Sequence, residues 1–207
     1  MGRKVSINEF KNFVLHFSSM EPKFYTPIDE ALFKTRFVQL SGAVNAQMAQ
    51  EVNRTLLAME LTDPNAPVYL FINSPGGEVT SGFSIFDTAR FIKPKVITIV
   101  AGLAASMGSL IALCADKESR VALPNSKFLI HQPLISGTLT GQASDLDIHA
   151  RDIIKTKNKI NRIYSEATGK PLEEIEKATD RDFWMTAEEA LDFGLISRIV
   201  TSHSEVR

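Results

Sequence analysis

Two continuous apolar segments, each ended by a glycine-rich turn, constrain the fold of this chain more than any other feature. They cover residues 68–72 and 96–100 and are rich in valine and isoleucine. Such runs are typical of strands buried on both faces of a parallel sheet. Residues 44–61 carry apolar side chains at helical spacing, and residues 79–92 also have a helical pattern. This alternation predicts an α/β fold with parallel crossovers.

The flanking sequence extends the same pattern. Residues 1–25 are weakly patterned and are interpreted as an N-terminal arm, and residues 26–207 as a single domain. The further strands are expected over 37–40, near Val121, and over 128–130 and 195–200; the further helices are expected over about 106–115, over about 143–167, and after Pro171.

Composition argues against several classes of protein. A net charge of −1 gives no overall field for nucleic acid or an anionic membrane. No apolar run approaches the roughly 20 residues of a membrane span, and charged residues interrupt the N-terminal segment, so we expect no secretory signal. The single cysteine, Cys114, lies in an apolar run and is expected to be buried. We expect a cytoplasmic protein with no disulfide, no catalytic metal, and no nucleic-acid or membrane partner.

The turn after the second apolar strand carries the first candidate for chemistry. Small residues fill positions 101–109, and Ser106 lies where the next helix is expected to begin. A serine there is surrounded by free N–H groups at the positive end of the helix dipole, which suits a nucleophile that generates an oxyanion. On local evidence alone a helix cap is the ordinary interpretation. Ala104 and Gly108 flank Ser106, so this is not the Gly-x-Ser-x-Gly elbow of α/β-hydrolases.

A second glycine-rich turn follows the first apolar strand. Gly76 and Gly77 place bare backbone N–H groups at the carboxyl end of that strand, the edge of a parallel sheet where ligands bind. Gly77 could donate to an oxyanion, although on local evidence a simple tight turn is the preferred explanation of the pair. No Gly-Lys-Ser/Thr follows, which argues against a phosphate loop.

One of the four histidines is placed to act as a base. His131 directly follows the apolar strand 128–130, whereas His16, His149 and His203 lie in the arm, the long helix and the C-terminal tail. A structural histidine is an equally good explanation of His131 taken alone. Two candidate orienting acids, Asp180 and Asp182, follow a helix end, where they would otherwise form a capping and salt-bridge cluster.

Taken together, these segments resemble the proteolytic subunit of the Clp protease family. The similarity covers roughly residues 36–200. It rests on four motifs in the family's order: Asn73-Ser74-Pro75-Gly76-Gly77, Ala104-Ala105-Ser106-Met107-Gly108-Ser109, His131-Gln132-Pro133 and Asp180-Arg181-Asp182.

The resemblance implies a serine endopeptidase. Ser106 would be the nucleophile, His131 the general base and Asp182 the acid that orients the imidazole. The backbone N–H groups of Gly77 and Met107 would form the oxyanion hole. The implied fold is the Clp/crotonase-type spiral of repeated β-β-α units with a protruding handle, made of a strand and the long helix, over about residues 132–167.

The resemblance also implies partners. Subunits would assemble into heptamers and tetradecamers, with Asp180 and Arg181 at the ring–ring contact, and would cut unfolded polypeptides to short peptides. A separate hexameric AAA+ Clp ATPase would feed in the substrate. This chain has no Gly-x-x-x-x-Gly-Lys-Ser/Thr motif, so we expect it to bind no cofactor and the partner to use the ATP.

Two departures from the family pattern keep alternatives open. Residues 24–28 do not match the family's Arg-x-Tyr-Asp-Ile stretch, and the segment 131–142 is about two residues longer than usual. One alternative is a divergent paralogue that is poorly active alone and is activated by a second Clp proteolytic subunit in mixed rings. Others are an inactive structural subunit and a crotonase-type acyl-CoA enzyme, which would need acid/base carboxylates instead of a Ser/His pair.

Overall fold

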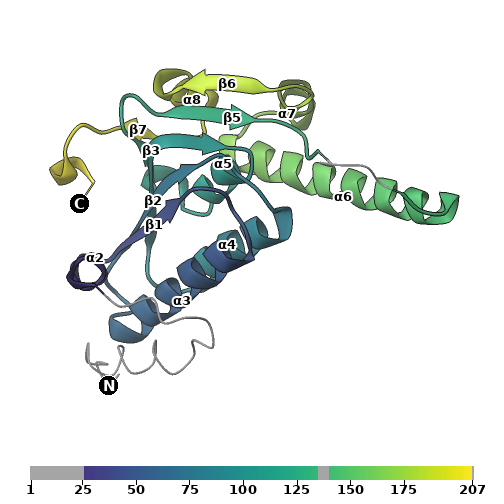
Figure 1. Cartoon of the computed structure of the whole chain (residues 1–207). Helices are drawn as coiled ribbons and strands as arrows, with labels where there is room; N and C mark the ends of the chain where they lie inside the picture. The colour runs from purple at the N-terminus through teal and green to yellow at the C-terminus, as the bar shows by residue number, and fades with distance from the viewer. Residues whose placement is uncertain (1–25, 135–139, 207) are drawn as a thin grey trace.

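The computed structural model describes residues 26–134 and 140–206, in which seven strands form one sheet (Figure 1). Neighbouring strands run in the order β1-β2-β3-β4-β7, and β5 pairs with both β3 and β6. Every pair is parallel except β5 with β6. The strands are β1 (Phe37–Ser41), β2 (Val68–Ser74), β3 (Val96–Ala105), β4 (Arg120–Ala122), β5 (Lys127–Ile130), β6 (Phe183–Thr186) and β7 (Arg198–Ile199).

Strand β3 is the axis of the sheet. Its first half pairs with β4 and its last residues pair with β5, through Leu103 with Lys127 and Ala105 with Leu129. The sequence pattern predicted a strand that ends at Val100 and a turn from 101 onward. That boundary was wrong, because pairing with β5 keeps the small residues up to Ala105 extended.

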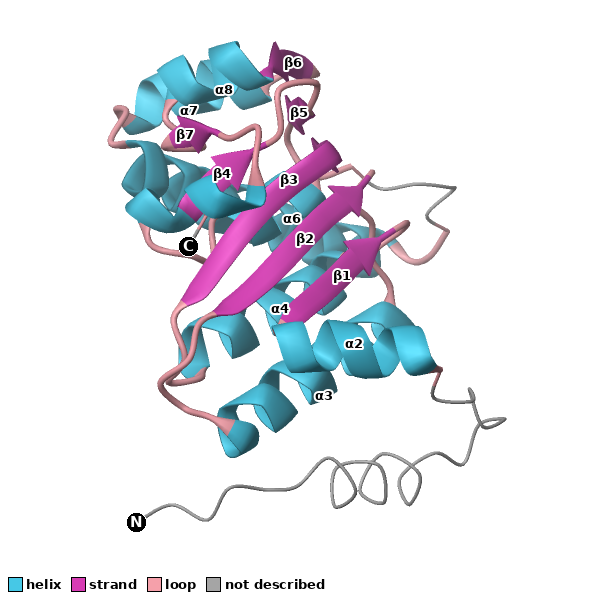
Figure 2. Ribbon diagram, turned by 90° about the vertical axis from the view of Figure 1, so that its left-hand side faces the viewer, coloured by secondary structure: helices cyan, strands magenta, loops and turns pink. Residues whose placement is uncertain are grey.

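Helices cover one face of the sheet, as Figure 2 shows for α3 and α4 beside the parallel strands. The main core lies between these helices and the sheet, and it includes the almost fully buried Leu40, Leu56, Leu70 and Leu110. A smaller apolar cluster covers the opposite face and includes Val206 of the C-terminal segment. The helices are α2 (Pro27–Thr35), α3 (Ala46–Thr62), α4 (Val79–Phe91), α5 (Met107–Ala112), α6 (Ala143–Thr168), α7 (Leu172–Thr179) and α8 (Ala187–Phe193), with short 3₁₀ turns at η1 (Lys117–Ser119) and η2 (His203–Glu205).

Helix α6 leaves the body of the molecule as a long arm (Figure 1). Residues 140–152 are all exposed, whereas Ile160, Asn161 and Tyr164 are buried near the other end. This arrangement confirms the α/β fold with a protruding long helix. The strand expected in the handle falls on residues 135–139, which lie outside the described residues. Within the described ranges, no helix is both long and apolar enough to span a membrane.

Three elements were not expected from the sequence: α2, β6 and α8. Helix α2 starts at a capping box in which Thr26 accepts from the Asp29 amide and the Asp29 carboxylate accepts from the Thr26 amide. A second box, between Thr186 and Glu189, starts α8. Both helices are short and carry little apolar periodicity, so only their capping residues indicate in the sequence where they begin.

Arg36 ties the first strand to the end of α3. Its backbone has φ 62°, a left-handed conformation that ends α2. Its guanidinium donates to the carbonyls of Met59, Asp63, Ala66 and Pro67 and to the Thr62 hydroxyl. One planar cation therefore serves carbonyls of the helix end and of the loop that follows it, and it also complements the negative end of the helix dipole.

We expect Arg36→Ala to lower the free energy of unfolding by about 2–3 kcal/mol, because it leaves several partly buried carbonyls without a donor. Arg198→Ala is the matched control, since the Arg198 side chain donates only to the exposed Glu205 carbonyl. It should cost less than about 1 kcal/mol. Urea unfolding at a fixed protein concentration measures both, and equal losses would contradict the role given to Arg36.

Candidate active site

Ser106 lies at the junction between β3 and α5 in a strained backbone conformation. Its φ of 53° and ψ of −124° lie outside the usual regions, and Arg36 is the one other described non-glycine residue with positive φ. Such strain costs about 1–3 kcal/mol and is concentrated at functional sites. The side chain makes no capping hydrogen bond to α5. The helix-cap interpretation of Ser106 is therefore wrong.

The Gly76–Gly77 turn packs directly against Ser106. A Cβ atom added to Gly76 would lie 2.6 Å from Ser106 Cβ, 2.7 Å from the Ala105 oxygen and 2.9 Å from the Met107 nitrogen. Gly76 also has φ 88°, a conformation that glycine adopts without penalty. The turn thus needs glycine because the backbone passes so close to the serine.

Two backbone N–H groups beside Ser106 have no protein acceptor in the described part of the chain: those of Gly77 and Met107. Val44 holds the turn from the other side, since its N–H donates to Gly76 O and its carbonyl accepts from Glu78 N. The Met107 N–H belongs to the first turn of α5, where amides have no helical partner. Donors in fixed positions of this kind suit a developing negative charge.

His131 lies one residue beyond β5, and its side chain is largely buried. Its Nδ1 atom is 3.4 Å from Asp182 Oδ1, and the Asp182 side chain is 64% exposed. The two residues line a groove of about 480 Å³ with Gln132, Leu134, Asp180 and Arg181. Neither a His131–Asp182 hydrogen bond nor one between Ser106 and His131 is formed in the described structure. The acid and base are paired, but loosely.

The remaining candidates occupy separate places. The Asp180 and Arg181 side chains are both exposed and lie 3.8 Å apart. Burial raises the pKa of the Cys114 thiol to about 12, so this cysteine is no nucleophile near neutral pH. No group of three potential metal ligands occurs among the described residues.

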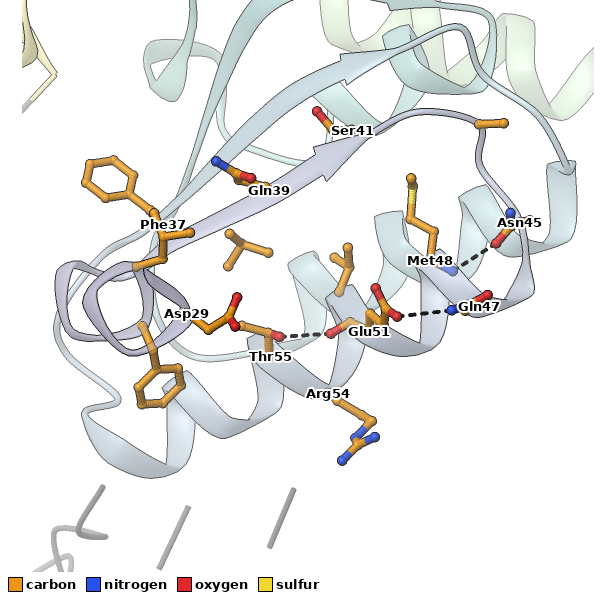
Figure 3. Close-up of a pocket in the computed structure, with 15 residues that line it drawn as sticks. Asp29, Phe37, Gln39, Ser41, Asn45, Gln47, Met48, Glu51, Arg54 and Thr55 are labelled. Atoms are coloured by element: carbon orange, nitrogen blue, oxygen red, sulfur yellow. Dashed lines mark hydrogen bonds between the residues drawn. The ribbon is translucent and has the colours of Figure 1, made fainter. Parts of the chain in front are cut away.

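A larger cavity, of about 660 Å³, lies away from the serine between α2, β1 and α3 (Figure 3). Its walls include Asp29, Gln39, Asn45 and Glu51, but no histidine or cysteine. It therefore offers no pairing of a nucleophile with a base. The smaller groove is lined by the His131 imidazole and the Asp182 carboxylate. Ser106 and the free N–H groups of Gly77 and Met107 are not part of its lining and lie at the glycine turn instead.

Comparisons with known proteins identify the family of the chain. Residues 20–203 match the model of the family described as Clp protease. A protein of Protochlamydia amoebophila named ATP-dependent Clp protease proteolytic subunit 1 is 48% identical over 91% of this chain and 92% of its own length. Subunit 1 of Chlamydia trachomatis is also 48% identical, over 90% and 97%. Subunit 3 of Rhizobium meliloti is 51% identical over 84% and 88%.

The packing of Gly76 makes a stability prediction. Gly76→Ala should lower the free energy of unfolding by about 3 kcal/mol or more, because the new methyl meets backbone atoms that cannot rotate away. Gly169→Ala is the control: φ is 78° there as well, but nothing lies within 4 Å. It should cost only about 1 kcal/mol. Equal losses in urea unfolding would show that the turn does not pack on Ser106 as described.

Proposed function

Because the chain belongs to the Clp protease family, we propose that it is the proteolytic subunit of an ATP-dependent protease and that Ser106 is its nucleophile. The observation that carries the assignment to Ser106 is its strained, uncapped position with the Gly76–Gly77 turn packed against it. Its substrates are unfolded polypeptides, which it cuts to short peptides.

The mechanism is acyl transfer in two steps. His131 removes the Ser106 proton as the oxygen attacks the scissile carbonyl, and then gives that proton to the leaving amine. Water hydrolyses the acyl-enzyme with His131 again acting as base. The free N–H groups of Gly77 and Met107 receive the oxyanion of each tetrahedral intermediate. Asp182, on the Nδ1 side of the ring, fixes the tautomer that leaves Nε2 to take the proton and stabilises the imidazolium.

The long helix provides a surface for self-association. Leu146, Ile148 and Ile154 are 38%, 63% and 56% exposed on α6. Acidic residues are more frequent in its outer half and basic residues in its inner half: Asp145, Asp147 and Asp152, then Lys155, Lys157, Lys159 and Arg162. The exceptions are Arg151, which pairs with Asp147 at 2.7 Å, and Glu166. Two antiparallel copies would bury the apolar side chains and bring opposite charges together. We assign this contact to the junction of two heptameric rings in a tetradecamer, with Asp180 and Arg181 also at the junction.

The partner that uses ATP is a separate hexameric AAA+ unfoldase. The chain lacks a phosphate-binding loop, so the proposal requires no cofactor or metal on this subunit. We place the protease in the cytoplasm, where a single buried cysteine is compatible with reducing conditions.

One observation favours a second form of this function, a subunit that is poorly active alone. The His131–Asp182 distance of 3.4 Å and the exposure of Asp182 describe an acid that is not yet held against its base. Assembly, either with copies of itself or with a second Clp paralogue in mixed rings, would supply the contacts that hold it.

The first test is labelling with a fluorophosphonate probe, followed by mass spectrometry. We expect label on Ser106 and none in Ser106→Ala. Asp182→Asn should lower the labelling rate by about 10²-fold or more, because it alters the tautomer and charge of the base. An unlabelled Ser106, with and without a second Clp subunit, would exclude the serine peptidase and favour a crotonase-type enzyme on a related fold.

The second test addresses assembly. Replacing both Ile148 and Ile154 with Ser should shift the protein from tetradecamers toward single rings, since each lost apolar contact is repeated in every subunit. Sedimentation velocity measures the distribution. Leu191→Ser, on α8 and 36% exposed, is the control and should leave the distribution unchanged. A double variant that stays fully tetradecameric would remove α6 from the ring junction.

A further inference from the structure

We propose that Asn161 and Tyr164, neighbours on the buried side of α6, are positioning residues through which this helix sets the nucleophile and the acid of the triad relative to one another. The inference rests on the proposed function, because it takes Ser106 and Asp182 as members of one triad. Both side chains are almost completely buried, at 0% and 1% exposure, three residues apart on one helix. Their polar atoms reach opposite halves of the site.

Tyr164 reaches the nucleophile half through Ser109. Its hydroxyl lies 2.7 Å from Ser109 Oγ, which in turn lies 2.7 Å from Ser106 O and 3.0 Å from Leu129 O. Ser109 has one hydroxyl hydrogen, which it donates to a carbonyl. The Tyr164 hydroxyl must therefore be the donor to Ser109. Burial raises the pKa of Tyr164, which keeps that proton in place.

This chain of hydrogen bonds ends on the strained residue itself. Leu129 O also accepts from Ser106 N, at 2.9 Å. The carbonyl and the amide of Ser106 are thus both tied to the Ser109–Leu129 pair. A backbone held at φ 53° persists only when its surroundings fix it from several sides. Tyr164 supplies the side that comes from α6.

Asn161 reaches the acid half through Thr179. Its Oδ1 atom accepts from the Thr179 hydroxyl at 3.0 Å, at the C-terminal end of α7. The next two carbonyls along that segment, of Thr179 and Asp180, accept from the backbone and side-chain amides of Gln132 at 2.6 and 2.8 Å. The segment that leads to Asp182 is therefore fastened to the residue after His131.

Asn161 is joined to Thr179 whichever way its amide is oriented. The Thr179 hydroxyl has one hydrogen to donate, and it lies 3.0 Å from Asn161 Oδ1 and 2.9 Å from the Ile175 carbonyl. With Oδ1 facing Thr179, the Asn161 Nδ2 atom is buried and has no hydrogen-bond partner among the described residues. With the amide turned over, Nδ2 donates to the Thr179 oxygen while that hydroxyl donates to Ile175 O, so both groups are satisfied. In either orientation this side chain joins α6 to the end of α7.

Helix α6 joins the two halves because it is a single rigid element. Its outer half is exposed along residues 143–152, while residues 160–164 hold the site. A displacement of the outer half by a bound partner therefore moves both anchor points together. The site can be aligned or misaligned from a distance without any contact between the partner and the triad.

The test compares kcat and KM for peptide hydrolysis, together with fluorophosphonate labelling, in the assembled protein. Tyr164→Phe and Thr179→Val should each lower kcat by about 10-fold and leave KM within about 2-fold, since small misplacements of reacting groups cost this much or more. Thr179→Ser keeps the hydroxyl and should restore kcat. Thr98→Val is the matched control: it removes a buried hydroxyl bond, 2.8 Å long, to Ala112 O at the end of α5 away from Ser106, and kcat should be unchanged.

A double-mutant cycle separates the two links. The double variant of Ser109→Ala with Tyr164→Phe should lose no more kcat than the more damaging single variant. The losses of kcat in Tyr164→Phe and Thr179→Val should instead multiply when the two are combined. The inference fails if kcat falls as much in Thr98→Val as in Tyr164→Phe, or if Thr179→Ser does not recover the wild-type kcat. It also fails if the variants that lose activity are those that lose assembly in sedimentation. Normal labelling of Ser106 in every variant overturns the inference alone, whereas an unlabelled wild-type Ser106 overturns the proposed function and this inference with it.

Discussion

The hydrogen bond from Ser106 N to Leu129 O is the contact on which the rest of the site depends. It continues the parallel pairing of β3 with β5 one residue past the end of β3. Because His131 lies two residues beyond Leu129, this single bond fixes how far His131 lies from Ser106 along the strand direction. The ten-residue length of β3 serves the same purpose, since a strand that ended at Val100 would never reach β5. Residues that look like a flexible turn in the sequence are therefore the rigid support of the serine.

Strain and close packing then determine which residue types the site accepts. Ser106 is held at a positive φ, and the space beside it is filled by a glycine turn that leaves no room for a side chain. Both features are unfavourable for stability, and the large core beneath the sheet offsets them. They coincide with two backbone N–H groups, those of Gly77 and Met107, that have no protein acceptor among the described residues. A more relaxed backbone would satisfy these donors within the fold and lose the site.

The sequence predicted the order of strands and helices well where apolar periodicity was strong, as for residues 68–72 and 143–167. It failed where structure depends on pairing or capping: the end of β3 is set by β5, and α2 and α8 are set by capping boxes. The site behaved in the same way. Local patterns left Ser106 as a cap and His131 as ambiguous, and only their joint resemblance to a family singled them out. Ser109 entered only as the last residue of a family motif, and Tyr164 and Asn161 carried no signal, because a buried polar residue gains meaning only from its partner.

The loose pairing of His131 with Asp182 follows from the position of the acid. Asp182 lies between α7 and β6 and is exposed in the single chain, and β6 is the four-residue edge strand of the sheet, which pairs only with β5. Edge strands of four residues are weakly held, and an exposed carboxylate gains little from its contact with an imidazole. The nucleophile, by contrast, is built into the centre of the sheet. If Asp182 is the acid of the proposed triad, completing that triad requires the ordering of only this peripheral segment. Under the proposed function, the strained serine would be formed in every subunit, and assembly would have only the acid left to position.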